Sequence, residues 1–281
     1  MVDKSFILIS NQRCGSTWFI TSIGNCKAVS TDYEVKWSKS LLIGQPSPYH
    51  LFLSDKKIEN IFNYFPNMDK HTLYGTKFVF DFYRAFPANH YNKFINKFNN
   101  FKIIHITRDY IDILKSKLIG KVIHLLDPKN FENKRLIDST ILAKQKDYVE
   151  KLQLSKSNNE IVRMKDANSY LTNLFINDVL TLSLKNQNQY LNLKYEDLKT
   201  NMHLVSDFLN ISVEDLNQNF FVKPVIKKNK LNYKNNFENY EDLKKINTKF
   251  KQKIDFLINN NFDFNKVIFY DEYNKKLNIK I

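Results

Sequence analysis

The chain has 281 residues, of which 43% are hydrophobic and 26% are charged, and these proportions are ordinary for a globular protein. They exclude wholesale disorder and collagen-like structure, and the sequence has no run of about 18 apolar residues, the length that a membrane span needs. Two cysteines, Cys14 and Cys26, allow at most one disulfide, which excludes a disulfide scaffold and favours a reducing compartment. The first apolar run, residues 6–9, is too short for a secretion signal, so we expect a cytoplasmic protein.

The 43 Lys and Arg against 29 Asp and Glu give a net charge of +14, which suggests an anionic partner. The few arginines are scattered, whereas nucleic-acid-binding proteins usually cluster them. The chain is also rich in Asn, Ile, Phe and Tyr and has only five glycines, a bias that AT-rich coding produces. We therefore interpret most of the charge as solvated surface and a smaller part as attraction for a small anion, with no nucleic-acid partner.

Apolar runs and helical periodicity alternate along the chain. This alternation predicts one α/β domain over residues 1–281 with a mainly parallel sheet between layers of helices. Residues 120–160 are expected to be helical with a loop near Pro128, and residues 227–239 are expected to form a polar loop. Strands are predicted at 6–9, 73–82, 102–106 and 190–195, and helices at 18–23, 89–99, from 109 onward, 169–185, 202–209 and 240–258.

The loop after the first predicted strand, residues 12–17 (Gln-Arg-Cys-Gly-Ser-Thr), has the chemistry of an anion site. The first N–H groups of a helix favour negative charge, and Gly15 lets the backbone approach a ligand closely. Arg13, Ser16 and Thr17 add side-chain donors. An ordinary turn with Ser16 as the N-cap remains an equal alternative on spacing alone. The ATP/GTP loop G-x-x-x-x-G-K-[ST] is not met, which disfavours a nucleoside-triphosphate hydrolase.

Arg108 follows the third predicted strand, and Ser116 lies about two turns along the next helix. The two side chains can converge on one anion near the carboxyl edge of the sheet. Taken alone, a salt bridge from Arg108 to Asp109 or Asp112 and a surface hydroxyl at Ser116 are the simpler interpretations. Together with the first loop, Arg108 and Ser116 would clamp a ligand with two separated anionic groups.

Three segments in order resemble the sulfotransferases that use 3′-phosphoadenosine 5′-phosphosulfate (PAPS). Residues 9–18 (Ile-Ser-Asn-Gln-Arg-Cys-Gly-Ser-Thr-Trp) are similar to the family's 5′-phosphosulfate loop. Residues 104–116 are similar to its 3′-phosphate motif, in which an arginine and a serine stand at this interval. Residues 193–198 (Leu-Lys-Tyr-Glu-Asp-Leu) are similar to its Y-E-D-[LM] segment. The resemblance implies a three-layer P-loop-like fold and covers residues 6–209.

The departures from the family pattern point to one branch of it. Gln12 stands where proline is usual, Arg13 where the cytosolic eukaryotic branch has lysine, and Tyr110 where proline is usual. The Gln-Arg-x-Gly-Ser-Thr form is closer to bacterial carbohydrate sulfotransferases. The C-terminal Arg-Lys-Gly segment of the cytosolic branch is absent, and residues 227–230 (Lys-Lys-Asn-Lys) are a candidate substitute.

The resemblance implies a role for each matching residue, in a transfer that leaves adenosine 3′,5′-bisphosphate (PAP) and uses no metal. Arg108 and Ser116 would hold the 3′-phosphate, and Tyr195 would lie near the adenine, although a core aromatic is an equal interpretation. Arg13 would offset charge on the sulfuryl group. The residues that would bind the 5′-phosphosulfate are Arg13, Cys14, Gly15, Ser16, Thr17 and Trp18.

An acceptor hydroxyl needs a base within about 3 Å. The carbohydrate-type branch uses a glutamate shortly after the first helix, and this chain offers Glu34 and, second, Asp32 at the matching place. A solvated Glu34 paired with a lysine is the alternative. Lys77 is interpreted first as a surface lysine and second as a group that reaches the sulfuryl or the acceptor. His105, inside a predicted strand, is interpreted as buried structure.

Cys14 stands at a helix start, where its pKa can be lowered. However, neither a phosphatase-type Cys-x5-Arg pattern nor metal-ligand spacing is present, so neither a thiol nucleophile nor a metal site is expected.

Two other classes of function remain: a P-loop-type nucleoside or small-molecule kinase, and a nucleic-acid binder with salt-dependent affinity. The acceptor is expected to be a carbohydrate or a small molecule, with residues 40–70 and 120–160 around its pocket. Nothing in the sequence identifies the acceptor itself or the oligomeric state.

Overall fold

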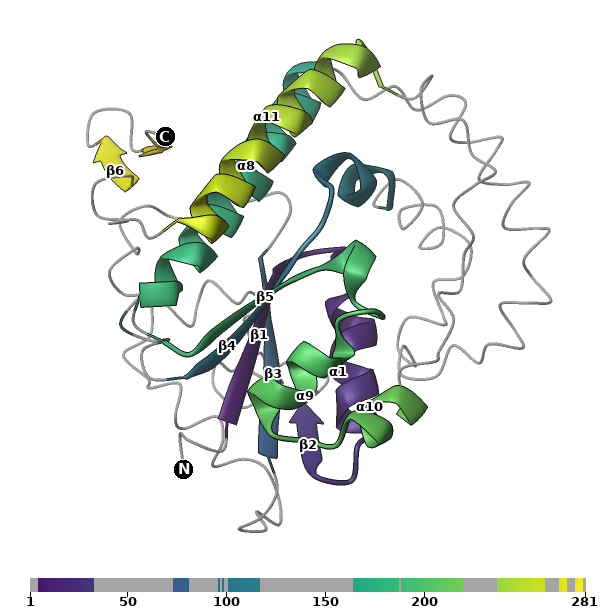
Figure 1. The fold of residues 1–281 in the computed structure, drawn as a ribbon. Coiled ribbons are helices and arrows are strands. Elements are labelled where there is room, and N and C mark those ends of the chain that lie inside the picture. The colour runs from purple at the N-terminus through teal and green to yellow at the C-terminus, as the bar shows by residue number, and fades with distance from the viewer. Residues whose placement is uncertain are drawn as a thin grey trace, which may run out of the picture. The chain divides into compact units, whose positions relative to one another are not determined.

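The computed structural model of the chain describes residues 5–32, 73–80, 96, 98, 101–116, 164–186, 188–219, 237–260, 268–271 and 276–279. Within these residues a five-stranded sheet has all its strands parallel, in the order β2-β3-β1-β4-β5, with helices on both faces (Figure 1). This confirms the predicted α/β fold with a parallel sheet between helices. The strands are Ser5–Asn11 (β1), Val29–Asp32 (β2), Leu73–Phe80 (β3), Lys102–Thr107 (β4) and Tyr190–Lys194 (β5).

Besides the five-stranded sheet, the described residues include helices, two 3-10 turns and a second small sheet. A separate antiparallel pair, Ile268–Asp271 (β6) and Lys276–Ile279 (β7), lies near the C-terminus of the chain. No helix in the described ranges is both long enough and apolar enough to cross a bilayer. The helices are Ser16–Gly24 (α1), Met164–Leu182 (α8), Met202–Leu209 (α9), Val213–Asn219 (α10) and Tyr240–Asn259 (α11), with 3-10 turns at Ser183–Asn186 (η5) and Tyr195–Asp197 (η6).

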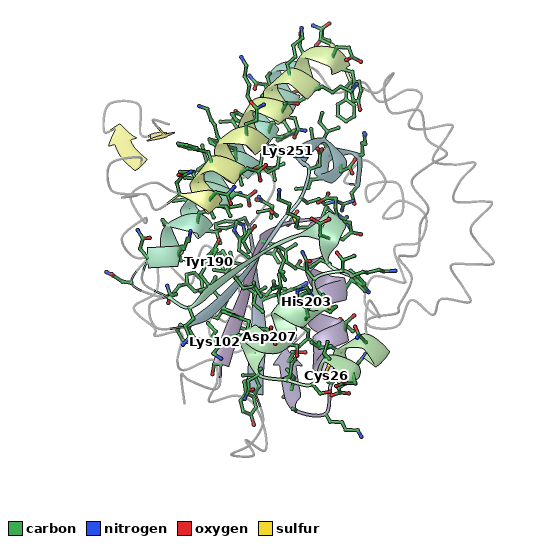
Figure 2. All side chains as sticks on the ribbon, in the orientation of Figure 1. Cys26, Lys102, Tyr190, His203, Asp207 and Lys251 are labelled. Carbon is green, nitrogen blue, oxygen red and sulfur yellow. The ribbon has the colours of Figure 1, made fainter. Side chains whose placement is uncertain are left out.

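The central strand β1 is buried along its whole length, which is why it reads as a continuous apolar run in the sequence. Because side chains alternate along a strand, the sheet presents two different faces. On one face Asn11 bonds to Leu174 and Asp178 of α8. On the opposite face Lys102 of β4 donates to the carbonyl oxygen of Phe208 in α9 (Figure 2).

Two compact units make up the chain. The whole sheet belongs to the first unit, in which Phe175 and Phe250 stack with ring centroids 4.5 Å apart. In the second unit Asp109 caps the helix at 110–116 by accepting from the N–H of Asp112, and Asn247 donates to its other oxygen. The first unit is Met1–Arg108, Thr172–Val222 and Phe250–Ile281, and the second is Asp109–Leu171 and Lys223–Lys249.

Most predicted elements are present within a few residues of the expected bounds. The predicted helix at 202–209 is α9, and the one at 169–185 begins earlier, at Met164. Strand β2, helix α10 and the β6-β7 pair were not predicted, because each has only four to seven residues and too few apolar positions to show a period. The predictions for 120–160, for most of 89–99 and for 227–236 fall outside the described residues.

Candidate functional site

The sheet order places the candidate site at the carboxyl end of β1. From β1 the chain passes through α1 to β2 on one side, whereas β4 pairs with β1 on the other side. Ligands of open parallel sheets bind outside the strand ends at such a reversal. The register pairs Ser10 with Ile106 and Thr107 with Lys194, so the segments that follow β1, β4 and β5 emerge next to one another.

The loop after β1 contains two residues in the left-handed region, Arg13 with φ 67° and Gly15 with φ 79°. Gly15 is the N-cap of α1, and no side chain caps this helix start, the part of a helix that favours negative charge. The interpretation of Ser16 as the N-cap is therefore wrong. Ser16 is the first helical residue and is buried.

Glycine is required at position 15 for two reasons. Its positive φ is strained for a residue with a side chain, and an added Cβ would overlap the ring of Tyr195. Tyr195, the first residue after β5, therefore packs directly on the loop. Trp18 meets the same ring edge-on, with centroids 6.5 Å apart.

Arg108 lies against this loop. Arg108 is 7% exposed, its Nη1 donates to the carbonyl oxygen of Arg13 at 2.5 Å, and its Cζ lies over the ring of Tyr195, 4.1 Å from the ring centroid. Its Nε has no hydrogen-bond partner among the described residues. The predicted proximity of Arg108 to the first loop is thus present in the structure.

Arg13 supplies a second cation to the same loop. Arg13 is exposed to solvent. Even so, nearby protein atoms partly desolvate its guanidinium and thereby lower its pKa. An arginine stays protonated at neutral pH under such a shift. Arg13 and Arg108 therefore bring two positive charges to one turn of backbone.

Lys77 of β3 also reaches the loop, which corrects its first interpretation as a surface lysine. The side chain is 3% exposed, and its Nζ donates to Oγ1 of Thr17 at 2.6 Å. The register sets Lys77 opposite Leu8. From there its long side chain runs along the sheet face toward α1, so the buried ammonium lies at the start of that helix.

Cys14 points into the protein instead of toward a ligand. The side chain is fully buried, and burial, followed by the negative charge of Asp178, raises the pKa of its thiol well above the ordinary value. The expectation that the helix start lowers this pKa is therefore wrong. The thiol of Cys14 is therefore not placed to bind an anion.

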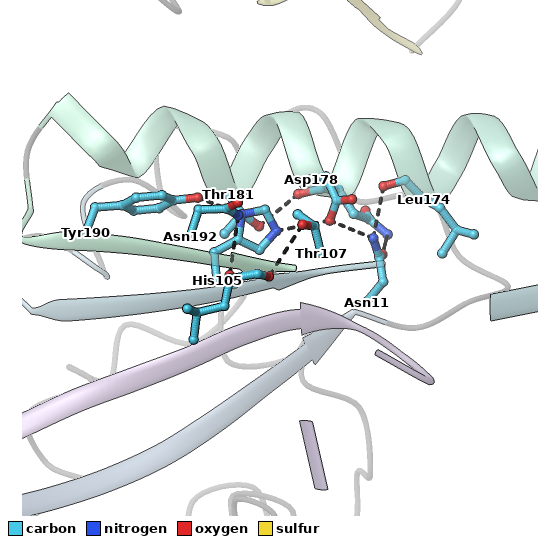
Figure 3. Close-up of polar contacts among 10 residues, drawn as sticks. Asn11, His105, Thr107, Leu174, Asp178, Thr181, Tyr190 and Asn192 are labelled. Carbon is cyan, nitrogen blue, oxygen red and sulfur yellow. Dashed lines mark hydrogen bonds and ion pairs between the residues drawn. The ribbon is translucent and has the colours of Figure 1, made fainter. Parts of the chain in front are cut away.

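Behind the loop lies a buried polar network that the sequence did not predict (Figure 3). Asn11, the last residue of β1, donates to Asp178 Oδ1 at 2.8 Å and to the carbonyl oxygen of Leu174 at 3.0 Å. His105 Nε2 is 3.1 Å from the same Asp178 oxygen. The network therefore ties the strand end that precedes the loop to α8.

The contacts of His105 identify its tautomer. Nδ1 lies 3.4 Å from the amide nitrogen of Asn192, which can only donate, and 2.6 Å from the hydroxyl of Tyr190, which can donate or accept, whereas Nε2 faces the carboxylate of Asp178, which can only accept. Burial, aided by the charge of Asp178, raises the pKa of Tyr190 well above its ordinary value, so its hydroxyl keeps its proton. Nδ1 is then the acceptor, and Nε2 carries the hydrogen that is donated to Asp178.

Other predicted site residues are less fully described. Asp32 ends β2 in register with Thr76, which itself pairs with Ile7, so its backbone lies level with the middle of β1 and not with the end of β1 at Asn11. Ser116 is half-buried on the helix at 110–116 in the second compact unit. Glu34 and residues 227–230 lie outside the described residues. In the described part of the chain, no group of three or more His, Cys, Asp or Glu is arranged to hold a metal.

No protein-family model matches the chain, and no curated protein matches it either. Among solved structures, the chain is similar to a sulfotransferase from Alicyclobacillus acidocaldarius. The similarity covers 92% of this chain and 97% of the other, with 12% sequence identity and a TM-score of 0.43.

Proposed function

We propose that the protein is a sulfotransferase that moves a sulfuryl group from PAPS to an acceptor hydroxyl of a carbohydrate or small molecule. The observation that carries this proposal is the position of Arg108, whose guanidinium contacts the loop before α1. Two arginines and an uncapped helix start suit a ligand with more than one anionic group. The three sequence motifs point to the same donor.

Each group at the site has a distinct task in this proposal. The first-turn N–H groups of α1 and the hydroxyls of Ser16 and Thr17 bind the 5′-phosphosulfate. Arg13 and Lys77 offset charge on the sulfuryl oxygens and on the leaving phosphate. Arg108 binds the 3′-phosphate through its unpartnered Nε, and Ser116 stays the second candidate for this group from the sequence motif alone. As in phosphoryl transfer, positioning and charge stabilisation supply most of the catalysis.

The bond changes follow from this arrangement. The acceptor oxygen attacks sulfur in line and forms the new S–O bond, while the bond from sulfur to the bridging oxygen of the 5′-phosphate breaks. The acceptor proton passes to a carboxylate, for which Glu34 is our first candidate and Asp32 the second. Arg13 and the helix start take up the negative charge that develops on the departing PAP.

Calorimetric titration with PAP tests the nucleotide site. We expect the wild-type protein to bind PAP and Arg108→Ala to bind it at least about tenfold more weakly, because a charge-assisted contact is lost. Lys102→Ala, which removes a lysine from the opposite end of β4, is the matched control and should bind as the wild type does. Equally poor binding by wild type and Arg108→Ala at sub-millimolar PAP would reject the site.

A screen of carbohydrate and small-molecule hydroxyl acceptors with labelled PAPS then identifies the reaction. Transfer of label to an acceptor supports the proposal. Turnover of ATP with Mg²⁺ in place of sulfate transfer would instead indicate a kinase.

The base is tested separately from the nucleotide site. Glu34→Gln is expected to lower turnover by about 10²–10⁴-fold, because the acceptor proton then has no base, while affinity for PAP stays nearly unchanged. Asp32→Asn is the comparison variant, and it should keep most of the activity if Glu34 is the base. Unaltered turnover in Glu34→Gln would reject this assignment.

A further inference from the structure

The loop before α1 adopts a backbone shape that its sequence does not favour. Three residues other than glycine have positive φ among those that the structure describes: Arg13, Asn210 and Asn239. Asparagine is enriched in the left-handed region, because its side chain can bond locally, whereas arginine gains no such compensation there. Arg13 therefore needs support from outside the loop to keep this conformation.

Arg108 is placed to supply that support. Its Nη1 donates to the carbonyl oxygen of Arg13, the residue with φ 67°. The guanidinium lies over the ring of Tyr195, and this ring packs against Gly15, the second left-handed residue of the turn. Arg108 and Tyr195 thus contact the loop at both of its left-handed residues, and we call this pair of contacting side chains the brace.

The strand register makes this brace possible. Thr107 pairs with Lys194, so Arg108 and Tyr195 are the next residues along two neighbouring strands. Both leave the sheet at the edge where β1 ends. Arg108 and Tyr195 are therefore each fixed at the end of a strand, and the loop packs against these two side chains.

We propose that Arg108 is a positioning residue for the phosphosulfate loop, in addition to its proposed contact with the 3′-phosphate. Its Nη1 holds the turn at Arg13, and its Nε has no partner among the described residues. One guanidinium can therefore serve both tasks, because it carries five donors in a fixed plane. Binding of the 3′-phosphate and the shape of the 5′ loop are then coupled through this side chain.

A positioning role for Arg108 affects ligands that lack a 3′-phosphate, whereas recognition of the 3′-phosphate alone does not. Adenosine 5′-phosphosulfate has no 3′-phosphate, so an arginine that only recognises that group contributes no hydrogen bond to its binding. If Arg108 also shapes the loop, the affinity for this ligand depends on Arg108 as well. Lysine at position 108 keeps the charge but lacks the planar guanidinium that lies over the ring of Tyr195, so it separates positioning from electrostatic attraction.

The first arm of the test uses no nucleotide. Hydrogen exchange of the loop amides, residues 13–17, is compared in wild type, Arg108→Ala, Arg108→Lys and the control Lys102→Ala. We expect exchange about tenfold faster in both Arg108 variants, confined to the loop, because the brace is lost and local opening becomes easier. Unchanged loop exchange in Arg108→Ala would overturn the inference.

The second arm rests on the proposed function and measures affinity for adenosine 5′-phosphosulfate and PAP by calorimetry. Both Arg108 variants are expected to bind adenosine 5′-phosphosulfate about tenfold more weakly than wild type or Lys102→Ala. Equal affinity of wild type and Arg108→Ala for this ligand, or full restoration of both readouts by Arg108→Lys, would overturn the positioning role. If wild type binds neither nucleotide, the proposed function fails, and the exchange arm alone decides whether Arg108 holds the loop.

Discussion

Replacing Lys77 with methionine is expected to lower kcat for sulfate transfer by about 10²–10³-fold, the usual loss when one donor that stabilises transition-state charge is removed. The ammonium of Lys77 is nearly fully buried and bonds to Thr17 in the first turn of α1. Charge that develops there is poorly screened by water, so a single cation has a large effect. Steady-state kinetics with PAPS and an identified acceptor give the measurement.

Methionine is chosen because its unbranched apolar side chain fills the space of the lysine stem. Thermal unfolding should therefore show that Lys77→Met still folds. Lys102→Met is the matched control, since Lys102 is another partly buried lysine of the same sheet that bonds to a carbonyl oxygen, that of Phe208. We expect it to keep wild-type kcat. Activity of Lys77→Met within about threefold of wild type would show that this ammonium does not act on the transferred group.

The framework of the site was predictable from local sequence. β1 is buried on both faces and is therefore apolar without interruption, and Gly15 stands out because the chain has only five glycines. Arg108 follows the third predicted strand, at 102–106, in the same way that the loop follows the first. Since parallel strands end at one edge, these local signals sufficed to predict that Arg108 and the loop meet.

The buried polar groups were not predictable, because they depend on contacts between distant parts of the sequence. Asn11 and Asp178 are 167 residues apart, and Lys77 and Thr17 are 60 apart. A lysine in an alternating strand looks the same in the sequence whether its ammonium reaches solvent or a helix start. His105 was correctly interpreted as buried, but its partners follow from the pairing of β4 with β5 and from the packing of α8.

Asp178→Ala is expected to lower the free energy of unfolding by about 2–6 kcal/mol, because two buried donors lose their acceptor at a cost of about 1–3 kcal/mol each. The substitution removes the acceptor of both Asn11 and His105, and it leaves their donors without that partner in the interior. Urea denaturation measures the change. Asp207→Ala, which removes an exposed carboxylate from α9, is the control and should stay within about 0.5 kcal/mol of wild type (Figure 2).

Asp178→Asn distinguishes a network in which His105 is neutral from one in which His105 is protonated. If His105 is neutral and donates from Nε2, the amide oxygen of asparagine can still accept, and the loss should be only about 1–2 kcal/mol. If His105 were an imidazolium, the same substitution would leave a buried cation without its counter-ion and would cost as much as alanine. Equal destabilisation by asparagine and alanine would therefore contradict the neutral tautomer that the donors Tyr190 and Asn192 indicate.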